Sequence, residues 1–194
     1  MKIFRTVCLA ALLSLALILP GNANAASPIK VAISTNMGLI VVELNQEKAP
    51  KTVSNFLFYV KSGFYEGTIF HRVIRNFMIQ GGGMTPDLKD KPNKRKPIQN
   101  EAYNGLRNRI YTIAMARTND PHSATSQFFI NVTNNDFLDY QNSSTSGFGY
   151  CVFGEVVQGK EVVDRIKNVP TTSVGMYQDV PRTPVVIEKV AILP

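Results

Sequence analysis

The sequence predicts a mainly β protein, and three observations lead to that fold class. About eight short apolar segments have the length of strands, whereas two others repeat their apolar residues at helical spacing. Several strand-like segments do not alternate between apolar and polar residues, as half-exposed strands do. Segments of this kind favour a closed β architecture over an open sheet, because closure leaves no unpaired edge.

The first predicted elements are a hairpin and a helix. Residues 30–35 and 39–44 read as two strands, and Gly38 marks the turn between them. Pro50 opens a helix and Gly63 ends it. The helical apolar positions expected to cover the core are Val53, Phe56, Leu57 and Val60.

The later elements follow in the same way. Two apolar runs lie within 70–83, and a polar connection then extends to about residue 109, which we expect to be a surface loop. An amphipathic helix is predicted at 159–169 through Val162, Val163 and Ile166. The remaining predicted strands are 111–117, 127–132, 150–157 and 184–193. Within 127–132, alternation places Gln127 and Phe129 on one face and Phe128 on the other.

The N-terminal segment has the form of a secretory signal peptide. Lys2 and Arg5 precede an apolar run of about 13 residues, which is short for a membrane span. Small residues at Ala23 and Ala25 predict cleavage after Ala25. We therefore expect residues 1–25 to be a signal peptide, residues 26–194 to be the mature domain, and no stable membrane association after cleavage.

Charge and cysteine content exclude several functions. The net charge is +7, and removing Lys2 and Arg5 leaves 19 basic and 14 acidic residues, or +5. The densest basic cluster, residues 89–96, contains Pro92 and reads as a solvated loop, so we expect no nucleic-acid binding. Cys151 alone would remain after cleavage, which excludes an internal disulfide, and no Cys/His spacing suggests a metal site.

The stretch 70–83 carries the most chemical information. Its first apolar run contains Arg72, its second contains Gln80, and three glycines close it. Arginine is rarely buried without a partner. One interpretation is two core strands in which Arg72 caps an edge. The other is an apolar surface that holds a fixed hydrogen-bond donor. Composition alone favours neither of these.

Several motifs in this order resemble one family. FHRVI followed by FMIQGG resembles the cyclophilin-type peptidyl-prolyl cis-trans isomerases, and so do segments 112–117, 126–130, 137–139 and 152–154. The likeness runs from about residue 29 to the end and is closest to the periplasmic cyclophilins of Gram-negative bacteria. It implies a closed eight-stranded antiparallel β-barrel capped by two α-helices, with substrate in an outer groove.

The resemblance also implies the site residues. Arg72 would donate to the prolyl nitrogen of a twisted amide, and Gln80 would hold the peptide and orient Arg72. Rotation breaks no bond, so neither a cofactor nor a metal is expected. The residues expected to bind substrate are His71, Phe77, Met78, Ala116, Arg117, Gln127, Phe129, Phe137, Leu138 and Tyr150.

Two of these positions depart from the family pattern. Phe137 stands where the family often has tryptophan, and Tyr150 where it often has histidine. Loss of the indole N–H predicts weak binding of cyclosporin, the family's cyclic-peptide inhibitor. The expected partners are proline-containing peptides and unfolded exported proteins. We expect a periplasmic monomer, with full secretion as the alternative location and a non-catalytic chaperone that grips proline segments as the alternative function.

Overall fold

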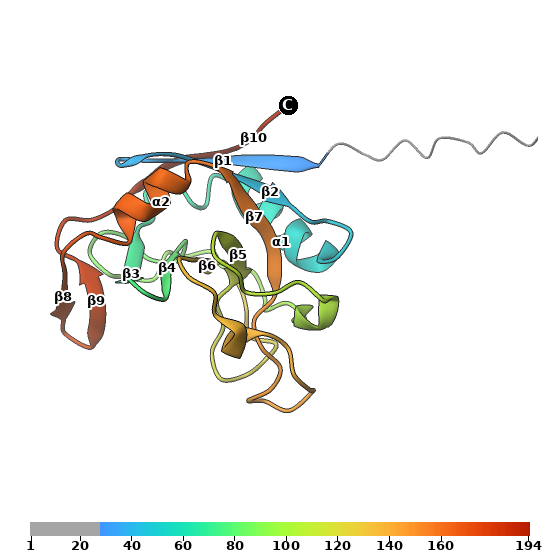
Figure 1. Ribbon diagram of the computed structural model, residues 1–194. Helices are drawn as coiled ribbons and strands as arrows, with labels where there is room; N and C mark the ends of the chain where they lie inside the picture. The colour runs from blue at the N-terminus through green and yellow to red at the C-terminus, as the bar shows by residue number, and fades with distance from the viewer. Residues whose placement is uncertain (1–27) are drawn as a thin grey trace, which may run out of the picture.

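The computed structural model describes residues 28–194, so the predicted signal peptide lies outside the described residues. Eight strands form one antiparallel sheet in the order β10-β1-β2-β7-β5-β6-β4-β3. Figure 1 shows this sheet curling around its core. The strands are β1 (Ile29–Thr35), β2 (Gly38–Leu44), β3 (Phe70–Ile74), β4 (Met78–Gly81), β5 (Thr112–Met115), β6 (Phe128–Asn131), β7 (Val152–Gln158) and β10 (Ile187–Ile192).

The two ends of this sheet meet without a continuous ladder. A bridge pairs Ile69 with Val186, just outside β3 and β10. Backbone hydrogen bonds from Phe70 N to Val185 O (2.9 Å) and from Ile187 N to Thr68 O (2.8 Å) join the same segments. The mainly β, eight-stranded antiparallel prediction is confirmed, but the word "closed" overstates it, because this seam is made by residues flanking the strands.

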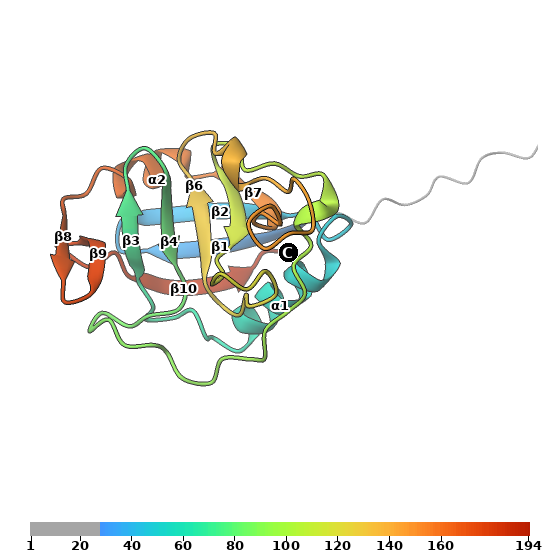
Figure 2. The ribbon, with the colours of Figure 1, turned by 90° about the horizontal axis from the view of Figure 1, so that it is seen from below.

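Two helices lie at opposite ends of the curled sheet (Figure 2): α1 (Pro50–Lys61) and α2 (Lys160–Ile166). Ala49 precedes α1 and has no side chain that could cap it. The carboxylate of Glu101 does so instead, accepting hydrogen bonds from the backbone of Lys51 (3.1 Å) and Thr52 (2.9 Å). This contact fastens the long connection between β4 and β5, which also contains the 3₁₀ turn Ala102–Asn104, against α1.

The sheet buries side chains on both of its faces. Inside the barrel, Phe128 and Ile130 of β6 join a large core with Phe56 of α1 and Phe153 of β7. Phe129, between them in sequence, belongs to a separate cluster outside the barrel. The alternation predicted for this segment is therefore present, although all four residues of β6 are buried.

A second hairpin was not predicted from the sequence. Strands β8 (Thr171–Val174) and β9 (Tyr177–Pro181) pair only with each other, and β9 packs against β3. Figures 1 and 2 both show this hairpin beside the β3 end of the sheet. Among residues 28–194, no helix combines the length and the apolar character that crossing a membrane requires.

Candidate functional site

One row of paired residues crosses four strands on the outside of the barrel. Arg72 of β3 lies opposite Gln80 of β4, Gln80 lies opposite Phe129 of β6, and Phe129 lies opposite Ala114 of β5. Directly paired residues point to the same face and have Cβ atoms about 5 Å apart. The row therefore aligns a guanidinium, an amide and an aromatic ring across one surface.

Arg72 stands at the border of that surface. Its side chain is 43% exposed, and its Nε lies 3.9 Å from a carboxylate oxygen of Asp179 in β9. The amide of Gln80 donates to Gln127 at 2.8 Å and makes no hydrogen bond with Arg72. The guanidinium is therefore neither buried nor closely bound, and most of its donors can reach a ligand.

The apolar part of the surface contains Phe77, Met78, Phe129 and Leu138, called here the outer cluster, which pack with the buried Ala114 and Val152. Met78, Phe129 and Leu138 are buried and Phe77 is half-buried. Strand alternation would place Phe77 opposite Met78, but Phe77 lies in the turn before β4 and so reaches the same cluster. Its ring stacks on Phe137, with centroids 5.6 Å apart, and Phe137 itself is 68% exposed.

Buried asparagines hold this cluster in place. Asn135 donates to the carbonyl of Phe77 at 2.8 Å and to Asn131 at 2.7 Å, which ties the 3₁₀ turn Asp136–Leu138 to β6 and to the turn before β4. Asn131 in turn donates to Asn108 at 3.2 Å. Sequence reasoning missed Asn108 and Asn135, because an asparagine between apolar segments usually indicates a turn.

Tyr150 and Arg117 form the far side of the surface. The Tyr150 ring meets Phe129 edge to face at 5.7 Å, and the Arg117 guanidinium lies 4.5 Å from the Tyr150 centroid. Arg117 also donates to the carbonyl of Gly149 at 3.0 Å. Ala116, beside it in sequence, packs against the outer cluster, and its backbone N–H is bonded to the carbonyl of Gln127.

A cavity of about 380 Å³, called here the hairpin cavity, brings four predicted site residues together: His71, Arg72, Gln80 and Gln127. His71 is 6% exposed, and its Nδ1 has no hydrogen-bond partner among the described residues. Burial lowers the pKa of His71 from 6.5 to about 4, outweighing the nearby Ile69 carbonyl, which raises it. The imidazole is therefore neutral at physiological pH.

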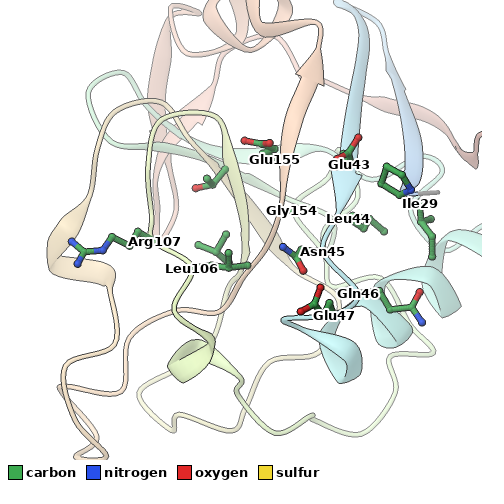
Figure 3. Close-up of a pocket in the computed structure, with 13 residues that line it drawn as sticks. Ile29, Glu43, Leu44, Asn45, Gln46, Glu47, Leu106, Arg107, Gly154 and Glu155 are labelled. Carbon is green, nitrogen blue, oxygen red and sulfur yellow. The ribbon is translucent and has the colours of Figure 1, made fainter. Parts of the chain in front are cut away.

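Two other features lie away from this surface. Burial raises the pKa of the Cys151 thiol to about 11, so it is an unreactive core residue. A cavity of about 830 Å³ lies where β2 and β7 meet, and none of the predicted site residues lines it. Figure 3 shows Glu43 and Glu155 on these neighbouring strands at its edge.

Comparisons with known proteins identify the family. The model of cyclophilin-type peptidyl-prolyl cis-trans isomerases matches residues 30–192. A peptidyl-prolyl cis-trans isomerase of Streptomyces antibioticus is 62% identical over 163 residues, which cover 84% of this chain and 98% of the relative. Peptidyl-prolyl cis-trans isomerase B of Escherichia coli is 58% identical, with the same two coverages.

A solved structure agrees with the sequence relatives. The crystal structure of a Cryptosporidium parvum cyclophilin-type isomerase, solved in the presence of the dipeptide Ala-Pro, matches with a TM-score of 0.70 and 27% identity. The match covers 85% of this chain and 99% of that one. The resemblance inferred from the motifs is thus confirmed, and the chain belongs to the cyclophilin-type peptidyl-prolyl cis-trans isomerases.

Proposed function

We propose that the outer surface of β3, β4 and β6 is the site at which this isomerase turns X–Pro bonds, with Arg72 as its catalytic donor. The observation that carries this proposal is the row Arg72–Gln80–Phe129, in which an exposed guanidinium borders an apolar cluster. The Cryptosporidium parvum isomerase was solved in the presence of the dipeptide Ala-Pro, which supports proline-containing peptides as the substrate class.

Catalysed rotation about an X–Pro bond requires a hydrogen-bond donor at the prolyl nitrogen and an apolar surface for the proline ring. The barrier to rotation is about 18–20 kcal/mol and comes from amide resonance, which is lost when the amide twists. The twisted prolyl nitrogen is pyramidal and has a lone pair that accepts a hydrogen bond, whereas the planar nitrogen does not. A donor placed at that nitrogen therefore stabilises the transition state more than the ground state. Arg72 supplies a permanently charged donor for it.

The other residues would hold the chain around the rotating bond. Phe77, Met78, Phe129 and Leu138 would take the proline ring, because they form the apolar cluster next to the row. Gln80 and Gln127 would bind the peptide backbone. The hydrogen bond from Gln80 to Gln127 supports the role of a peptide ligand for Gln80 more than that of a support for Arg72. The residues that would border the bound chain are His71, Ala116, Arg117, Phe137 and Tyr150.

The test compares Arg72→Ala with Arg75→Ala in an isomerisation assay on a proline-containing peptide. Arg75 is an exposed arginine in the turn after β3 and makes no ion pair among residues 28–194, so it is a matched control. We expect a loss on the order of 100-fold in kcat/KM for Arg72→Ala, the size typical of a lost transition-state donor, and little change for Arg75→Ala. Unchanged turnover in Arg72→Ala would remove Arg72 from its catalytic role. A wild-type chain that binds the peptide without accelerating its isomerisation would instead support the non-catalytic chaperone.

The cellular role is the second part of the proposal. The predicted signal peptide supports export of residues 26–194 and action on unfolded exported proteins in the periplasm. Intact-mass analysis of protein from a periplasmic extract tests this. A chain that begins at Ala26 is expected, and recovery of the intact precursor in the cytoplasm alone would contradict it. Recovery from the medium would favour secretion instead.

A further inference from the structure

The hairpin β8–β9 forms one wall of the hairpin cavity, opposite the proposed catalytic row. Arg72, Gln80 and Gln127 line the cavity from the barrel, and Met176, Gln178 and Asp179 line it from the hairpin. Phe129 of the outer cluster stands at the β6 side of this row, and Arg72 stands at the β3 side, against which β9 packs. A chain with its proline in the outer cluster therefore passes Arg72 and reaches the hairpin at one of its two ends.

The backbone of the hairpin holds one carboxylate toward Arg72 in an unusual conformation. Asp179 has a φ of 59°, which L-residues other than asparagine and aspartate rarely adopt. Its neighbours Val180 and Pro181 are buried, whereas the Asp179 side chain remains 39% exposed and lies 3.9 Å from Arg72. Aspartate tolerates this left-handed conformation because its short polar side chain can hydrogen-bond locally.

Two more residues line the hairpin cavity. His71 is buried, and its neutral ring adds no charge to the cavity at physiological pH. On the rim, Met176 at the hairpin tip is 86% exposed and is therefore free to contact a bound chain. An aliphatic side chain or stem packing on Met176 would cover it.

We propose that the hairpin β8–β9 determines which residue next to the proline the enzyme prefers. In this proposal the carboxylate of Asp179 offsets the positive charge of Arg72 and so sets the preference for the charge of that residue. With Asp179 present, the cavity offers amide donors and acceptors and little net charge, which suits uncharged polar side chains. Without Asp179, the guanidinium would attract an acidic flanking residue. Asp179 is thus a positioning and selectivity residue rather than a catalytic one. This inference rests on the catalytic surface proposed above.

The experiment measures kcat/KM for matched peptides that carry Gln or Glu at each position next to the Xaa-Pro bond. The wild-type chain is compared with Asp179→Asn, which keeps a residue tolerant of positive φ. Glu188→Gln is the control, because Glu188 is exposed on β10 and takes part in no ion pair between residues 28 and 194. We expect Asp179→Asn to raise the Glu-to-Gln ratio about fourfold at one position, an effect that 1 M salt diminishes.

Each outcome is decisive. An unchanged ratio at every position, or an equal change in Glu188→Gln, overturns the inference. If Asp179→Asn lowers kcat/KM equally for all peptides, Asp179 only positions Arg72, and the proposed selection by the hairpin is overturned. Met176→Ala is expected to raise KM for peptides with an aliphatic flanking residue while kcat stays the same. Failure of the proposed site is distinguishable, because Arg72→Ala would then leave turnover of every peptide unchanged.

Discussion

The two flanks of Arg72 are built in opposite ways. On one side, the outer cluster is buried, apolar and fastened by asparagine hydrogen bonds to β6 and the turn before β4. On the other side, the hairpin is largely exposed and polar. Its strand β9 packs against β3, and the ion pair between Asp179 and Arg72 joins half-exposed side chains. Exposed pairs of this kind are worth about 0–1 kcal/mol. A rigid apolar surface suits a ligand group that is always the same, such as the proline ring. An open polar wall suits the residues next to the proline, which vary from one substrate to another.

The largest expected difference between the two flanks is in stability. Phe129→Ala removes a ring that is 4% exposed, and we expect it to lower the free energy of unfolding by about 3–5 kcal/mol and to reduce activity on every peptide. Met176→Ala, at 86% exposure, should change stability by no more than about 0.5 kcal/mol. Denaturant unfolding measures both. A loss below 1 kcal/mol for Phe129→Ala would show that the outer cluster is not tightly packed.

The hairpin flank should show a specific dependence on pH. Because the pKa of His71 falls from 6.5 to about 4 on folding, the unfolded chain binds more protons between these pH values. Burial of the neutral His71 ring therefore leaves the free energy of unfolding undiminished above pH 6.5 and lowers it as the pH falls toward 4. The loss should be on the order of 2–3 kcal/mol.

The effect of His71 is isolated by measuring the free energy of unfolding of the wild-type chain and of His71→Gln at several pH values. Carboxylates titrate in both proteins, so their effect cancels in the difference. We expect the wild-type advantage to shrink from pH 7 to pH 4.5. A difference that stays constant over this range would mean that the histidine is solvated in the folded chain.

The smallest effect concerns the exposed edge of the outer cluster. Phe137 is 68% exposed and offers no hydrogen-bond donor, which is our reason for proposing weak cyclosporin binding. Phe137→Trp adds an indole N–H and should tighten cyclosporin binding roughly fivefold, the value of one net hydrogen bond. Tyr103→Trp, at an exposed aromatic outside the cluster, is the control. Equal titration curves for wild type and Phe137→Trp would show that Phe137 does not touch the ligand.

The two flanks also differ in how far the sequence predicts them. Met78, Gln80 and Phe129 follow from apolar strands, alternation and the family motifs. Phe77 followed from the motifs alone, because it lies in a turn, where alternation does not apply. The hairpin was missed because Thr171–Val174 and Tyr177–Pro181 are mostly polar and partly exposed, and so have no strand pattern. The monomeric state and the cleavage after Ala25 stay predictions.

The amino-acid sequence by itself determined the eight main strands, the two helices and the family, because these depend on local periodicity and on motifs read in order. Only the tertiary structure decided that Arg72 stands between an apolar cluster and a hairpin carboxylate, and that the barrel seam is made outside the strands. Arg72 and Asp179 are far apart along the chain and meet because β9 packs against β3. No local pattern of side chains encodes a contact that depends on how two distant elements dock.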